Sequence, residues 1–209
     1  MFARILALLL TCLLLASCGG DGPPAAFQTQ VDRADLANQL RSDLATVPGT
    51  AYTAMPTSGS ATFGGYVLIG IDPVAGQSGD DLAILGDLEL TARFEGRGQV
   101  TGRADNLVAQ IGSTASAQVT GDILIGQRDS QIGYDAGTPG RLLRPNEWVA
   151  DYGGRLGVGG AVHVIAGELD GQFLGTRPGE AAVIRGVSAS GAGTTQTGAP
   201  YGITIFAEN

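Results

Sequence analysis

Hydrophobic and polar residues alternate along most of the chain after residue 60. The clearest case is Asp87–Glu95, where Leu88, Leu90, Ala92 and Phe94 share one face and charged or hydroxyl residues share the other. A period of two is typical of a β-strand with one buried face. The same reasoning predicts further strands over Ala61–Ile71, Leu82–Leu85, Gln99–Leu107, Ser116–Ile125, Arg155–Ile165, Glu168–Leu174, Ala181–Ser188 and Tyr201–Ala207.

One segment has a helical period instead. In Val31–Leu44 the residues Val31, Leu36, Leu40 and Leu44 roughly share one face, with charges on the other. The Pro and Gly of Val47-Pro48-Gly49 end the pattern. We expect residues 31–59 to form a short helix and a loop, with the helix packed against a barrel mouth or edge.

Turn signals recur at short intervals through residues 60–209, and no second low-complexity break divides them. This spacing favours an all-β fold, an antiparallel sandwich or barrel, over an α/β fold. The 34 glycines among 209 residues suit tight turns and close strand approach.

The N-terminus has the pattern of a secretory signal, because Arg4 precedes the apolar stretch Ile5–Ala16. The following Leu15-Ala16-Ser17-Cys18-Gly19 resembles the lipobox of bacterial lipoproteins. The resemblance implies a signal peptide over residues 1–17, fatty acylation (palmitate) of Cys18, and a flexible tether over residues 18–30. Gly19, in place of the Asp that retains such proteins in the inner membrane, implies outer-membrane sorting. Ordinary cleavage that leaves a free Cys18 is the alternative.

Charge and cysteine content narrow the function classes. All 12 basic residues are Arg, and 20 acidic residues give a net charge of −8. A net-negative chain without a basic run is a poor candidate for nucleic-acid binding, where phosphate contacts dominate affinity. Cys12 leaves with the signal peptide and Cys18 is used by lipid, so no thiol remains for a disulfide or a metal.

The most interesting candidate site is the segment that contains Arg141, Arg144 and the only Trp of the chain, Trp148. Arg and Trp are enriched at binding hot spots, and loops often carry function. We therefore take these three residues as candidate ligand-binding residues in an irregular mid-chain loop. An equally weighted alternative is that Trp148 plugs the barrel.

Other constellations are weaker. His163 is the only His and has no thiol or carboxylate motif beside it, so we expect a surface or strand residue and not a metal or haem ligand. The loop carboxylates Asp72, Asp80, Asp81 and Asp87 lack the spacing of an EF-hand. No catalytic constellation, metal site or cofactor motif is found, which predicts a protein that is not an enzyme.

Several segments together resemble the β-barrel domain of transferrin-binding protein B and related bacterial surface lipoproteins. The motifs are Ala61-Thr62-Phe63-Gly64-Gly65-Tyr66, Gly86–Phe94 with Gly98–Gly102, Gly167–Gly175, Glu180–Gly186 and Ile203–Ala207. The likeness spans residues 60–209 and covers one barrel only. It implies a single antiparallel β-barrel of about eight strands, whose interior side chains can just fill. The core residues that it implies are Leu88, Leu90, Phe94, Leu169, Phe173 and Phe206.

This resemblance implies a lipid-anchored protein of the outer membrane, surface-exposed or on its periplasmic face. Such a protein captures a protein or small ligand through loops at one mouth of the barrel, for example for nutrient uptake. The implied partners include an outer-membrane translocon or a TonB-dependent receptor. The alternative is a structural or assembly lipoprotein of the envelope that captures no solute.

Overall fold

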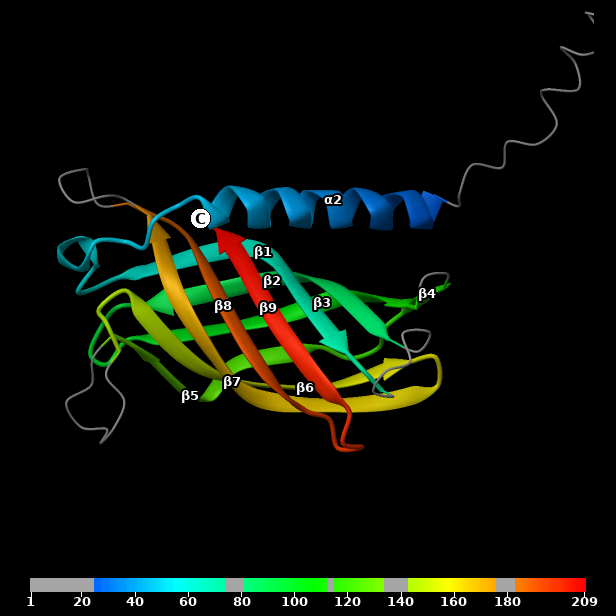
Figure 1. Ribbon diagram of the computed structural model, residues 1–209. Helices are drawn as coiled ribbons and strands as arrows, with labels where there is room; N and C mark the ends of the chain where they lie inside the picture. Colours follow the sequence, from blue (N-terminus) through cyan, green and yellow to red (C-terminus); the bar gives the residue numbers. More distant parts are fainter. Residues whose placement is uncertain (1–24, 74–80, 113–114, 134–142, 176–182) are drawn as a thin grey trace, which may run out of the picture. The chain divides into compact units, whose positions relative to one another are not determined.

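The computed structural model describes residues 25–73, 81–112, 115–133, 143–175 and 183–209. The chain divides into two units, residues 1–35 and 36–209, and the second unit contains an antiparallel β-barrel (Figure 1). The barrel strands are β1 (Ser60–Ile71), β2 (Leu82–Arg93), β3 (Gln99–Ile111), β5 (Ile123–Ile132), β6 (Glu147–Val158), β7 (Ala161–Gly175), β8 (Ile184–Thr194) and β9 (Pro200–Glu208).

Eight strands close the barrel. Neighbouring strands pair in the order β2-β1-β9-β8-β7-β6-β5-β3, and a further β2–β3 pairing completes the ring. The short strand β4 (Ala115–Gln118) pairs with the end of β3, next to the stretch of β3 that pairs with β5. The predicted single antiparallel barrel of about eight strands is therefore confirmed. Closure removes the two free edges that an open sheet would have.

Two predicted strands are interrupted, in both cases by glycine. The segment predicted as one strand over Arg155–Ile165 contains the turn between β6 and β7, where Gly159 and Gly160 have φ of 57° and 86°. Two consecutive positive φ angles are what a tight hairpin turn requires. The segment Ser116–Ile125 is likewise divided between β4 and β5, and Gly121 between them has φ of 99°.

The interior of the barrel is filled by large apolar side chains. Phe173 on β7 packs against Phe63, with 6.2 Å between ring centroids, and against Phe94, at 5.6 Å. All six predicted core residues are buried. Phe206 differs from the others because it belongs to a separate buried cluster with Leu174 and the second half of the helix.

Large rings lie over glycines of the neighbouring strand. Trp148 is paired in register with Gly171, and a Cβ on that glycine would lie 2.1 Å from the indole Cε2 atom. Tyr152 lies over its partner Gly167 in the same way, where a Cβ would be 2.8 Å from the phenol oxygen. Each ring occupies the space that a side chain on the glycine would need. Part of the high glycine content is therefore a requirement of packing aromatic rings inside a narrow barrel.

Helix α2 (Ala25–Ala45) begins before the predicted start at Val31. Within residues 36–209, Ala37 and Leu44 are buried, whereas Leu36 is 54% exposed. The sequence pattern placed Leu36 on the helix face that packs on the barrel, but that face contains Ala37 instead. The cluster consists of Ala37, Leu44, Leu174 and Phe206, with Leu40, Val47, Tyr66, Leu68 and Leu85 partly buried around it.

The contact of α2 is with the outer wall of the barrel. The aromatic side chains of Tyr66 and Phe206 lie with ring centroids 6.3 Å apart on this wall, and Leu44 lies against Gly186. After the helix, the chain adds to the end of β7, where the N–H of Thr50 donates to the carbonyl of Phe173 at 2.8 Å. The short 3₁₀ helix η1 (Tyr52–Ala54) follows before β1 begins.

The pairing between β7 and β8 covers only part of both strands. It runs from Asp170 opposite Ser190 to the end of β7, so the first part of β7 pairs with β6 alone. Tyr201 of β9 bridges this gap: its hydroxyl donates to the carbonyl of Ala166 at 2.8 Å and accepts from the N–H of Ala166 at 3.1 Å. A side chain thereby satisfies backbone groups that lack a strand partner.

A second buried phenol extends this network. The hydroxyl of Tyr152 donates to that of Tyr201 at 2.9 Å, and the two rings meet edge to face. Burial, together with the hydrogen bond to Tyr201, raises the pKa of Tyr152 far above its ordinary value of 10.0. The folded protein therefore holds this proton more tightly than the unfolded chain does.

This pKa shift predicts a loss of stability in base. The contribution is complete below pH 10.0 and is lost as pH rises above it. We expect the free energy of unfolding to fall above that pH, by up to about 1.4 kcal/mol per pH unit from this group. Urea unfolding between neutral pH and pH ~11 measures the effect. Tyr152→Phe should flatten the decline, whereas Tyr52→Phe, at a position that is 51% exposed, should leave it unchanged. Equal slopes in all three proteins would contradict the assignment.

Candidate functional site

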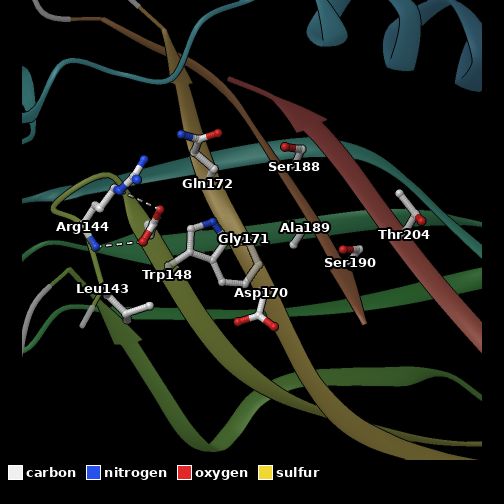
Figure 2. Close-up of a pocket in the computed structure, with 11 residues that line it drawn as sticks. Leu143, Arg144, Trp148, Asp170, Gly171, Gln172, Ser188, Ala189, Ser190 and Thr204 are labelled. Atoms are coloured by element: carbon white, nitrogen blue, oxygen red, sulfur yellow. Dashed lines mark hydrogen bonds and ion pairs between the residues drawn. The ribbon is translucent and has the colours of Figure 1, made fainter. Parts of the chain in front are cut away.

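Because large side chains fill the barrel interior, a binding site has to be sought on the outside. A hollow of about 650 Å³ lies on the outer wall, across β6, β7, β8 and β9 (Figure 2). We call it the outer groove. Its lining residues are Leu143, Arg144, Glu147, Trp148, Asp170, Gly171, Gln172, Ser188, Ala189, Ser190 and Thr204.

Strand register places the polar residues of the outer groove in rows. Asp170 on β7 lies opposite Ser190 on β8, which in turn lies opposite Thr204 on β9. Gln172 lies opposite Ser188 in the next outward-facing row. Alternate residues of a strand face opposite sides of the sheet, so these side chains point outward while their neighbours fill the core. Three strands thus supply carboxylate, amide and hydroxyl groups to one surface.

Small residues leave little side-chain bulk on the outside of this part of the barrel wall. Gly171 has no side chain, and the indole of Trp148 lies directly against it from the inside of the barrel. The two serines of β8 add little bulk above the backbone, and Ala189 between them faces the interior, in register with Gly171. The floor of the outer groove is therefore a flat stretch of strand backbone that a rigid, fully buried ring supports from below.

One side of the outer groove is a turn that its own hydrogen bonds hold in shape. The N–H of Glu147 donates to the carbonyl of Arg144 at 2.9 Å, and the N–H of Arg144 donates to the Glu147 carboxylate at 2.8 Å. Pro145 and Asn146 are the two central residues, in accordance with the preference of Pro for the second position of a type I turn. The turn presents a guanidinium group and a carboxylate together at the edge of the groove (Figure 2).

The ion pair of this turn is loose. Arg144 Nε lies 3.7 Å from Glu147 Oε1, and the Arg144 side chain is 67% exposed. An exposed pair of this kind contributes at most about 1 kcal/mol to stability. The terminal nitrogens of the guanidinium remain accessible to a molecule in the outer groove.

The predicted site residues do not share one environment in the structure. Arg144 lies at the edge of the outer groove as part of a loop, as expected. Trp148 lies in strand β6 and not in an irregular loop, and its side chain is 0% exposed. Its position fits the alternative in which it fills the barrel. Arg141 and Cys18 lie outside the described residues.

The weaker candidates gain no ligand set from the structure. His163 lies on β7 and is buried, and within the described part of the chain its Nδ1 has no hydrogen-bond partner. Asp72 and Asp81 line another hollow, between β1, β2 and β9, while Asp80 lies outside the described residues. Among the residues that the structure describes, no group of three or more His, Cys, Asp or Glu side chains could hold a metal ion.

Sequence reasoning missed most of the outer groove. Asp170, Gln172, Ser188, Ser190 and Thr204 were not singled out, because each is an ordinary outward-facing polar residue of a strand. The signal that was present is a run of small polar outward residues on three strands that follow one another in the chain. The strand register that brings them together could not be read from that pattern.

Comparisons with known proteins add no identification. No family model matches the chain, and comparison with curated proteins and with solved structures gives no match. The described part of the chain contains no helix that has both the length and the apolar character needed to pass through a bilayer.

Proposed function

We propose that this protein is a lipid-anchored binding protein of the bacterial outer membrane and that it is not an enzyme. A barrel of the transferrin-binding protein B type carries the binding surface in this proposal. The ligand, a protein or a small molecule, is captured outside the barrel, at the mouth formed by the Leu143–Glu147 loop and along the adjoining wall. A translocon or a TonB-dependent receptor is the kind of membrane partner that this role requires.

One observation carries the proposal: a polar groove beside a rigid turn lies on a barrel whose interior is already filled. A filled barrel has no room for a ligand at its centre, so binding has to use loops and the outer wall. The outer groove offers a hollow of about 650 Å³ with donors and acceptors from four strands and one loop. Binding residues held by a rigid scaffold are a common arrangement in proteins.

The anchor is supported by the lipobox that ends at Cys18 and by the Gly- and Pro-containing tether after it. We expect Cys18→Ser to abolish acylation and to move the protein from the membrane to the soluble fraction. Several acyl chains give durable anchoring, whereas a single chain binds only marginally. Mass spectrometry of the mature N-terminal peptide together with cell fractionation measures both effects. A wild-type peptide without fatty acid would contradict the proposal.

Capture can be tested on cells that display the full chain. Extracellular fluid is offered to the cells, and bound molecules are cross-linked and identified. We expect to identify a specific molecule that is captured by the wild type but not by the Arg144→Ala variant. The Arg155→Ala variant should still capture it, since Arg155 is an exposed residue at the far end of β6. If only envelope proteins are cross-linked and neither variant changes them, the alternative of a structural or assembly lipoprotein is correct.

A further inference from the structure

We propose that strand β7 binds the same strand of a second copy of this chain, through an edge that has no strand partner in its own barrel. This surface lies apart from the outer groove, and its role goes beyond the proposed capture function without depending on it. Three features support the pairing: a stretch of unpaired backbone, the absence of charged residues along it, and its fit to a copy of itself.

Near its start, β7 lacks a strand partner on one side among the residues that the structure describes. Its stretch Ala161–Gln172 is paired with β6, whereas pairing with β8 extends only from Asp170 to the end of the strand. Beyond Ser190, β8 is paired with β9 alone. In Figure 1 the turn between β6 and β7 lies apart from the turn between β8 and β9. We call the stretch Ala161–Gly167, on its side away from β6, the open edge.

The open edge presents backbone donors and acceptors. The N–H and the carbonyl of Ala166 both bond to the hydroxyl of Tyr201, so these groups point away from β6. Backbone groups of an antiparallel strand alternate between its two sides, and those of Val162 and Val164 therefore point the same way. Within the described part of the chain, neither valine has a backbone hydrogen bond to another strand on this side. Each offers an N–H and a carbonyl to a further strand.

The composition of the open edge does not protect it from pairing. Natural proteins often block exposed strand edges with charged residues or Pro. The sequence Ala-Val-His-Val-Ile-Ala-Gly of the open edge contains neither Pro nor any Asp, Glu, Lys or Arg. Val162, which is 37% exposed, shares the outward face with Val164 and Ala166, while His163 is buried on the inward face. An apolar edge of this kind is a template for another strand.

A second copy fits this edge because two identical antiparallel strands are related by a two-fold axis. With the axis at His163, Val162 of one copy lies opposite Val164 of the other, and the same pair occurs twice. Each pair exchanges both of its N–H to carbonyl bonds, and the two outward valine side chains contact each other. This register leaves Ala166 bonded to Tyr201, so the barrel itself does not have to change.

The charge of the chain does not oppose the contact locally. The net charge of −8 repels two copies at long range, but salt screens such repulsion beyond about 8 Å at physiological ionic strength. The nearest charged residues along the two strands are of opposite sign: Arg155 pairs with Val164 from β6, and Glu168 follows the open edge on β7. The residues that meet at the two-fold axis are apolar, apart from the inward-facing His163.

Disulfide cross-linking tests the pairing and its register in cells that produce the full chain. Val162→Cys and Val164→Cys are produced together as two differently tagged copies, and copper phenanthroline is added as oxidant. In the proposed register these positions have Cα atoms about 5.5 Å apart, a distance that a disulfide spans. We expect a cross-linked heterodimer from the mixture. Either variant alone should give little product, because a position and its own copy lie about 7–8 Å apart on the diagonal.

Leu124→Cys is the matched control for chance encounters. Leu124 is an outward apolar residue that is 43% exposed, but β5 is paired there with both β3 and β6. A mixture of Leu124→Cys and Val164→Cys therefore measures collision alone and should give little heterodimer. The wild-type chain reports any disulfide that forms through its own cysteines.

A charge at the open edge should prevent the pairing, as Lys does at natural strand edges. We expect the full chain in detergent to sediment as monomer and dimer in proportions that depend on concentration. Val162→Lys should remove the dimer, whereas Leu124→Lys, a comparable change on a fully paired strand, should retain it. Far-UV circular dichroism of both variants verifies the fold.

Four outcomes overturn the inference. The mixture gives no heterodimer above the collision control; one variant cross-links with itself as strongly as the mixture does; Val162→Lys leaves the dimer intact; or Val162→Cys cross-links only to a different protein. The last outcome would assign the open edge to another partner. None of these results bears on capture at the outer groove, which Arg144→Ala tests separately.

Discussion

Trp148→Ala is expected to lower the free energy of unfolding by about 3–5 kcal/mol, the usual cost of truncating a buried large aromatic side chain. The indole is 0% exposed and packs directly against Gly171 of the neighbouring strand. Its removal leaves a cavity that two paired strands cannot close without losing their register. Urea unfolding followed by far-UV circular dichroism measures the change.

Trp148→Phe is the matched control. The indole Nε1 is buried and has no hydrogen-bond partner among the residues that the structure describes, so replacing the indole with a phenyl ring removes no hydrogen bond seen there. The phenyl ring still fills part of the space, and the loss should be clearly smaller than for Ala. The opposite result would be a free energy of unfolding within about 0.5 kcal/mol of the wild type together with loss of ligand capture. In that case Trp148 is a binding residue and not a core residue.

Gly65→Ala is expected to destabilise the barrel by about 3 kcal/mol, at the upper end of the usual cost of overpacking. A Cβ at this position would lie 2.2 Å from the carbonyl oxygen of Phe206 and 2.5 Å from Cα of Ala207. Both obstacles are backbone atoms of β9, so no side chain can turn aside to make room. Strands β1 and β9 would have to separate at this point of the barrel wall.

The adjacent Gly64→Ala provides a control with the identical chemical change. Nothing lies within 4 Å of a Cβ at Gly64, which faces outward on the same strand. Replacing this glycine reduces the freedom of the unfolded chain and should stabilise the protein by up to about 1 kcal/mol. Because the effect on the unfolded chain is nearly the same at both positions, the difference in urea midpoint reports the contact inside the barrel. Equal midpoints for the two variants would contradict the packing described here.

Gly64 and Gly65 mark a limit of what the alternation of apolar and polar residues can predict. Alternation of apolar and polar residues located most strands, because a strand with one buried face has to repeat every two residues. Gly64 and Gly65 carry no side chain and so give no alternation signal. Their opposite environments became visible only once β1 was paired with β9.

The candidate site was harder to find than the fold. Arg144 was singled out because Arg is common at binding surfaces, and it lies at the edge of the outer groove. Trp148 was singled out for a similar reason, yet the strand places it inside the barrel. Residue type indicates what a side chain can bind, but only its face on the strand decides whether a ligand can reach it.

The sequence by itself determined the class of structure: a period of two, frequent glycine turns and one helical segment are sufficient for an antiparallel all-β fold with a helix before it. The tertiary structure alone decided which residues meet. Asp170, Ser190 and Thr204 form one row because β7, β8 and β9 pair in one particular register. Register depends on the packing of the whole core, since a shift of one residue would turn each strand inside out.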